Sequence, residues 1–185
     1  MFDLSNEFLQ PLTGTIRYYR ADLDHPVAGT WSIQIPLAPF SADDEYEPTT
    51  FRPGLGGPTL IETEISLDFI KLPATHLMAL NQQTFDFATD FEEGFIDGSI
   101  YLLATHNRVH VTRIDFGLGG TDQITASLHA AFDFEHARTG IRTRTAELDA
   151  MLLFQLVDRL PAPQPPTNPE NRHLQLGRID NGPQD

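Results

Sequence analysis

The chain has 185 residues, of which 40% are hydrophobic, and its 26 acidic residues against 12 basic ones give a formal charge of −14. This length and hydrophobic content suit one globular domain with a tail, and the negative charge repels phosphate backbones, so nucleic-acid binding is not expected. The chain has no cysteine. Disulfides, thiolate metal sites and cysteine nucleophiles are therefore excluded.

The first residues of the chain do not resemble a secretory signal. Asp3 stands where a signal peptide carries basic residues, and no apolar run follows. No stretch approaches the ~20 apolar residues that are needed to cross a bilayer. We therefore expect a cytoplasmic protein that does not contact membranes.

Two β-rich stretches come first, at residues 12–20 and 30–37. The second alternates apolar and polar side chains from Trp31 onward, which is typical of a strand with one buried face. Pro26 and Gly29 mark a loop between the two stretches. We predict an antiparallel hairpin with a long connection.

Residues 38–58 are rich in proline, glycine and acids. A loop of this length in a compact domain is usually functional or disordered, so the segment is either a binding loop or an inert excursion. Aromatic side chains beside charges are common on protein-binding surfaces. The candidate partner-binding residues in this loop are Asp43, Asp44, Glu45, Tyr46 and Phe51.

Residues 59–72 alternate as a strand, with Ile65 and Phe69 on the apolar side and Glu62 and Glu64 on the polar side. This pattern predicts a second amphipathic strand that presents carboxylates on its outer face.

The middle of the chain is less regular. Residues 74–81 favour one or two helical turns. Residues 95–104 and 108–116 are predicted strands, separated by a tight turn at the sequence T-H-N-R. Residues 145–157 alternate like a strand but also have good helix propensity; we favour the strand, because it would extend the neighbouring β meander.

The clearest strand covers residues 123–136, and the rest of the domain is expected to be organised around it. Its apolar face runs from Ile124 to Phe134. Its polar face contains His129, Asp133 and Glu135, and any chemistry in this region would have to lie there.

Together these elements predict a mainly β fold: a single antiparallel β-sandwich or curved-sheet domain over residues 1–157, with little helix. Residues 158–185 form a proline-rich tail, which we expect to be extended because proline cannot donate to a β ladder. Such a tail could also mediate self-association by reaching over a neighbouring copy.

The sequence contains no motif for a cofactor. G-L-G-G occurs at residues 54–57 and 117–120, but a phosphate-binding glycine loop needs a helix behind it, and a strand is predicted after the second copy. Phosphate-binding P-loop, G-x-S-x-G and H-E-x-x-H motifs are absent. We predict no cofactor and no assigned catalytic residue.

Two functional hypotheses remain, and the first is favoured. The protein is a non-enzymatic acidic interaction protein with a basic protein partner, either a bacterial toxin-neutralising (immunity-like) protein or an assembly component. The second is a hydrolase-like enzyme or a binder of a small ligand or metal, which uses a histidine and carboxylates on one sheet face. Its candidate residues are His129, Asp133, Glu135, Glu62 and Glu64. The second hypothesis requires that these residues converge in one pocket.

Overall fold

The computed structural model describes residues 8–41, 60–88, 94, 96–102, 105–134 and 142–160. Its strands are β1 (Gly14–Tyr19), β2 (Trp31–Pro36), β3 (Phe40–Ser41), β4 (Leu60–Ile61), β5 (Glu64–Ile70), β6 (Thr84–Asp86), β7 (Asp97–Leu102), β8 (Thr105–Gly119), β9 (Gln123–Asp133) and β10 (Arg144–Val157). A short 3-10 helix, η2 (Leu77–Leu80), lies where one or two helical turns are predicted.

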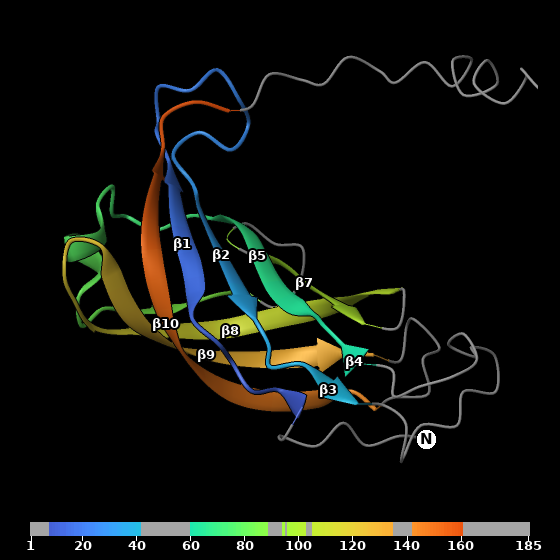
Figure 1. The fold of residues 1–185 in the computed structure, drawn as a ribbon. Coiled ribbons are helices and arrows are strands. Elements are labelled where there is room, and N and C mark those ends of the chain that lie inside the picture. Colours follow the sequence, from blue (N-terminus) through green and yellow to red (C-terminus); the bar gives the residue numbers. More distant parts are fainter. Residues whose placement is uncertain are drawn as a thin grey trace, which may run out of the picture.

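Seven strands form a closed β-barrel (Figure 1). Around the ring the order is β8, β7, β5, β2, β1, β10 and β9, and β9 pairs with β8 to close it. Strand β6 adds to β8 as an extra strand, while β3 and β4 form a separate two-stranded sheet. The prediction of a mainly β fold with little helix is confirmed, but the sheet closes on itself and does not form a sandwich.

The prediction of a wholly antiparallel sheet is wrong at one seam. β1 and β10 run parallel, with Gly14 opposite Leu152 and Tyr19 opposite Val157. The other neighbours in the ring are antiparallel. A closed ring with an odd number of strands cannot alternate direction at every step, so at least one parallel pair is unavoidable.

Strand β10 confirms that residues 145–157 form a strand, and it divides its length between two neighbours. Its Arg144–Leu153 stretch pairs with β9. Its pairing with β1 begins only at Leu152 and continues to Val157. Within the part of the chain that the structure describes, β10 before Leu152 is therefore paired on one side only.

Apolar side chains fill the barrel interior, and Trp31 lies among them with no exposed surface. Its Nε1 donates to the carbonyl oxygen of Ala74 at 2.9 Å. Its ring packs against Tyr18 on β1 and Phe154 on β10, with centroid distances of 4.9 and 6.0 Å. This cluster connects the parallel seam to the segment that follows β5.

Two strands approach each other so closely that only glycine fits between them. A Cβ at Gly98 in β7 would lie 2.2 Å from the carbonyl oxygen of Val109 in β8. That distance is far inside van der Waals contact, so any larger residue would push β7 away from β8.

The first hairpin is found as predicted, since β1 and β2 are antiparallel and Thr15 lies opposite Gln34. The predicted apolar face of β5 is wrong at one position. Phe69 has a φ of 58° and a relative exposure of 45%, whereas Ile70 is fully buried. The register with β2 shifts at this point, which is the signature of a β-bulge, and the extra residue reverses the alternation.

The predicted T-H-N-R turn is also wrong. Its first residue, Thr105, already belongs to β8, which continues unbroken to Gly119. The polar composition of these residues reflects an exposed strand end, although Asn107 is buried.

Strand β9 matches the predicted organising strand, with Ile124, Leu128 and Phe132 buried in the interior. Glu135 lies outside the described residues. So do residues 161–185 of the tail and the predicted loop residues Asp43, Asp44, Glu45, Tyr46 and Phe51. In the part of the chain that the structure describes, no helix is long and apolar enough to cross a membrane.

Candidate functional site

The polar side chains of β8, β9 and β10 lie on the outer surface of the barrel, because these strands turn their apolar side chains inward. β9 and β10 face each other with Ser127 opposite Asp149 and His129 opposite Glu147. Asp115 of β8 lies opposite Ser127 from the other side. We define the β9–β10 outer face by these residues and their outward neighbours: Asp115, Thr125, Ser127, His129, Thr145, Glu147, Asp149 and Met151.

Asp115 is the most heavily paired carboxylate of this face. Arg113 Nε donates to its Oδ2 at 2.8 Å, and Thr84 Oγ1 of β6 donates to its Oδ1 at 2.5 Å. His129 Nε2 lies 3.1 Å from its Oδ2. The hydrogen bonds from Arg113 and then Thr84 hold the pKa of Asp115 well below its ordinary value, although desolvation opposes them. These contacts tie β6, β8 and β9 together on the outside of the barrel.

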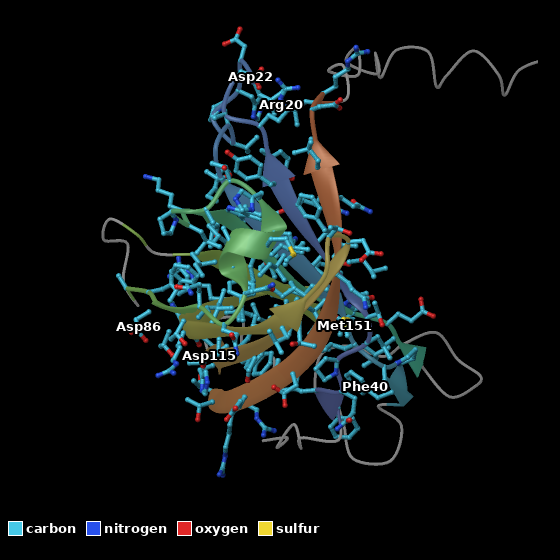
Figure 2. All side chains as sticks on the ribbon, turned by 90° about the vertical axis from the view of Figure 1, so that its left-hand side faces the viewer. Arg20, Asp22, Phe40, Asp86, Asp115 and Met151 are labelled. Carbon is cyan, nitrogen blue, oxygen red and sulfur yellow. The ribbon has the colours of Figure 1, made fainter. Side chains whose placement is uncertain are left out.

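Asp86 lies beside this cluster, opposite Arg113 in the β6–β8 pairing. Figure 2 shows Asp86 and Asp115 on the same flank of the molecule. Arg113 has a raised pKa, chiefly because it donates to Asp115. The guanidinium is therefore already engaged within the protein.

The carboxylates of β10 are less engaged. Ser127 Oγ donates to Glu147 Oε1 at 3.1 Å, and His129 Nε2 is 3.9 Å from the same oxygen, yet the Glu147 side chain remains 62% exposed. Asp149 is exposed and makes no hydrogen bond or ion pair within the described residues. Because Ser127 donates to Glu147 while His129 Nε2 faces Asp115, the arrangement is not a serine nucleophile held by a histidine base.

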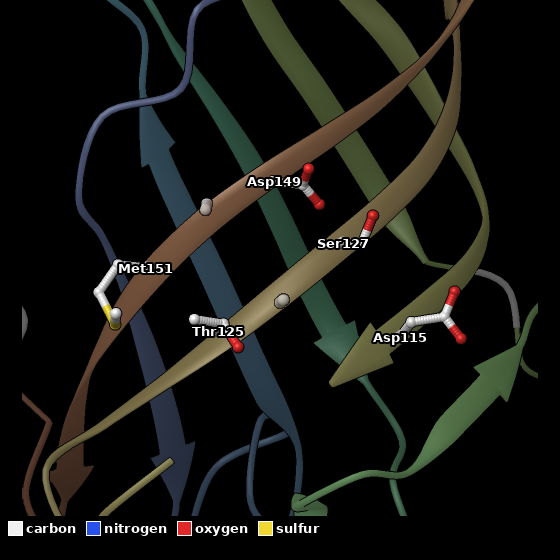
Figure 3. A pocket seen from close by; sticks show the side chains of 7 residues that line it. Asp115, Thr125, Ser127, Asp149 and Met151 are labelled. Atoms are coloured by element: carbon white, nitrogen blue, oxygen red, sulfur yellow. The ribbon is translucent and has the colours of Figure 1, made fainter. Parts of the chain in front are cut away.

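Two shallow hollows lie on this face. The larger, about 410 Å³, is shown in Figure 3, where Asp149, Ser127 and Asp115 project from β10, β9 and β8. The smaller is about 290 Å³. Asp115, Thr125, Ser127, Asp149 and Met151 line the first hollow, and Thr112, His129, Thr145 and Glu147 line the second. Each lining therefore contains both carboxylate and hydroxyl groups. Small residues complete the linings: Ala126 and Ala150 in the first hollow, and Ala130, Ala131 and Ala146 in the second.

The four predicted face residues that the structure describes, His129, Asp133, Glu62 and Glu64, do not converge. His129 and Asp133 both lie on the outer face of β9. Glu64 begins β5, and Glu62 lies just before it; β5 is separated from β9 by β7 and β8 on one side of the ring. β5 and β9 are therefore not neighbours in the barrel, and Glu64 does not lie opposite any residue of β9.

A second acidic pair lies elsewhere on the barrel. Asp68 of β5 lies directly opposite Asp97 of β7. Burial, and then repulsion from Asp97, raise the pKa of Asp68, while the charge of Arg17 acts in the opposite direction. This like-charge pair carries unfavourable electrostatic energy in the folded state.

A metal site is not evident in the part of the chain that the structure describes, because no group of three or more His, Asp or Glu residues there could hold an ion. Sequence reasoning did not select Arg113, Asp115, Glu147 and Asp149. The usable signal was their spacing of two residues within β8 and within β10, which places each pair on one strand face.

Comparison with protein-family models, curated proteins and solved structures gave no significant match.

Proposed function

We propose that the protein is a non-enzymatic interaction protein that binds a basic protein partner through the β9–β10 outer face. The observation that carries this proposal concerns Glu147 and Asp149, which are exposed neighbours on the outer face of β10 and border the two hollows. Within the described residues, their one contact with a basic side chain is the 3.9 Å approach of His129 to Glu147.

The charge of the β9–β10 outer face favours the binding of a basic side chain from a partner protein. Asp115 is already neutralised by Arg113, so an incoming cation finds its unmatched charge on β10. A formal charge of −14 also steers basic proteins toward the chain and accelerates their association at low salt. The hydroxyls of Thr125 and Thr145 provide acceptors at the edges of the hollows.

The hydrolase-like alternative has less support. It needed His129, Glu62 and Glu64 in one pocket, and they lie on different parts of the barrel. Neutralisation of a basic toxin and participation in an assembly are both forms of the proposed function, and identification of the partner separates them.

Affinity capture from extracts of the native host tests the proposal. The baits are the full chain, the double variant Glu147→Gln/Asp149→Asn, and the matched control Glu62→Gln/Glu64→Gln, which removes the same charge from another part of the surface. We expect a basic protein that the full chain and the control retain and that the β10 variant loses.

The recovered protein must then rebind as a purified component, in a complex that weakens as salt is raised. If every captured protein is retained equally by the two variants, the face is not the binding surface. If the only specific partner is acidic, the proposal is wrong.

A further inference from the structure

The unpaired side of β10 offers a second kind of recognition, through backbone hydrogen bonds. Residues on a strand direct their N–H and C=O groups alternately to the two sides. Phe154 N donates to Asp122 O on the β9 side, and Val157 O accepts from Arg20 N on the β1 side. Even-numbered residues of β10 therefore hydrogen-bond toward β9, and odd-numbered residues toward β1.

The register along β10 is continuous, so this alternation extends back to the start of the strand. β1 pairs with β10 only from Leu152. The N–H and C=O groups of Thr145, Glu147 and Asp149 consequently face a side on which no described residue pairs with them. The barrel is closed as a ring, but among the described residues β10 has a free strand edge here.

The same three residues turn their side chains outward, onto the β9–β10 outer face. The free edge therefore carries two carboxylates beside its free donors and acceptors. Near its end, where β1 separates from β10, Leu12, Met151 and Leu153 are exposed apolar side chains.

From this geometry we infer that the protein binds its partner by strand addition: an extended basic segment of the partner pairs with β10 at Thr145–Asp149. Its lysine or arginine side chains lie opposite Glu147 and Asp149. Its backbone supplies the hydrogen bonds, which is the mode of β-augmentation. The inference rests on the proposed function and specifies how the basic partner is recognised.

Charge decides between a basic segment and a second copy of this chain. If two copies paired antiparallel about Leu148, Glu147 of one copy would lie opposite Asp149 of the other, and like charges directly opposite are destabilising. The two carboxylates thus protect the edge from self-association, as charged residues commonly do on exposed edges. They favour a strand of the opposite charge.

The test uses the full chain, labelled for amide NMR, and a synthetic peptide of alternating lysine and valine as the probe. In the free protein we expect fast hydrogen exchange at the amides of Thr145, Glu147 and Asp149 and slow exchange at Ala146 and Leu148. On binding, the three odd-numbered amides should be protected at least tenfold. A second probe is the same peptide with every backbone nitrogen methylated, which keeps the charge but leaves no N–H to donate to β10 from either edge; it should bind at least tenfold more weakly.

The outcomes separate the inference from the proposed function. If both peptides bind equally and the odd-numbered amides stay unprotected, strand addition is overturned, while the charge-based proposal stands. If neither peptide perturbs β10, strand addition is overturned, and the capture experiment then decides the proposed function independently. Protection at the odd-numbered positions with the unmethylated peptide alone supports the inference.

Discussion

Two proline substitutions at neighbouring positions of β10 test the free edge directly. Thr145→Pro removes an N–H that faces the unpaired side, whereas Ala146→Pro removes an N–H that faces Ala130 of β9. Proline is tolerated in strands where its missing N–H would face solvent and is excluded where it would break a ladder. Both substitutions impose the same restriction on φ, so the difference between them reports the hydrogen bond together with the packing of Ala146, which is partly buried against the core.

The expected magnitude follows from the bond that is lost. Ala146→Pro leaves the Ala130 carbonyl without its donor, which costs about 1–3 kcal/mol in addition to the shared cost of the ring. Thr145→Pro loses no ladder bond, so its total cost should stay below about 1 kcal/mol. Ala146→Pro should therefore be less stable than Thr145→Pro by about 2 kcal/mol.

Urea denaturation provides the assay, with the fluorescence of Trp31, the only tryptophan, as the probe. The midpoint for Thr145→Pro should lie near that of the unmodified chain, and the midpoint for Ala146→Pro well below it; a failure of Ala146→Pro to fold agrees with this. Equal losses, or a larger loss for Thr145→Pro, would refute the assignment of the free edge.

Three further predictions concern the buried Trp31, the carboxylate of Asp115 and the like-charged pair of Asp68 and Asp97. Trp31→Phe leaves the Ala74 carbonyl without its donor and shrinks a buried ring, so the free energy of unfolding, followed by circular dichroism, should fall by about 3 kcal/mol; a loss below about 1 kcal/mol would contradict the packing. Asp115 has a lowered pKa, so the stability that its charged form contributes is complete above its ordinary pKa of 3.8 and is lost as the pH falls through and below that value. Asp115→Asn should therefore flatten the fall of the unfolding free energy at acid pH, and an unchanged fall would count against the contacts of Asp115 with Arg113 and Thr84. Asp68 has a raised pKa, so its negative charge destabilises the folded protein at neutral pH, and this penalty disappears at acid pH. Asp68→Asn should stabilise the protein at pH 7 by less than about 1 kcal/mol and give no gain below pH 3.8. Destabilisation at pH 7 would argue against the repulsion from Asp97.

The sequence was informative about strands because burial imposes a period of two. The alternation in residues 123–136 correctly separated the buried Ile124 and Phe132 from the outward His129. The same alternation favoured a strand over a helix for residues 145–157, as the structure confirms. Phe69 escaped this reasoning because a bulge adds a residue and reverses the faces.

Which strands become neighbours could not be predicted, because alternation describes one strand at a time. The parallel seam of β1 and β10 and the separation of β5 from β9 are properties of the closed ring. The residues around His129 differ from the predicted ones for the same reason. His129 was found on the correct face, but its actual neighbours, Asp115 and Glu147, come from strands whose register the sequence did not reveal.

The most direct test of the central claim is the affinity of the captured partner for three purified proteins: the full chain, Glu147→Gln/Asp149→Asn and Glu62→Gln/Glu64→Gln. Calorimetry at low and moderate salt should show that the first variant weakens binding at least tenfold while the second stays within about threefold, since only the first removes charge from the β9–β10 outer face. Equal affinity of the full chain and the Glu147→Gln/Asp149→Asn variant would contradict the claim that this face binds the partner.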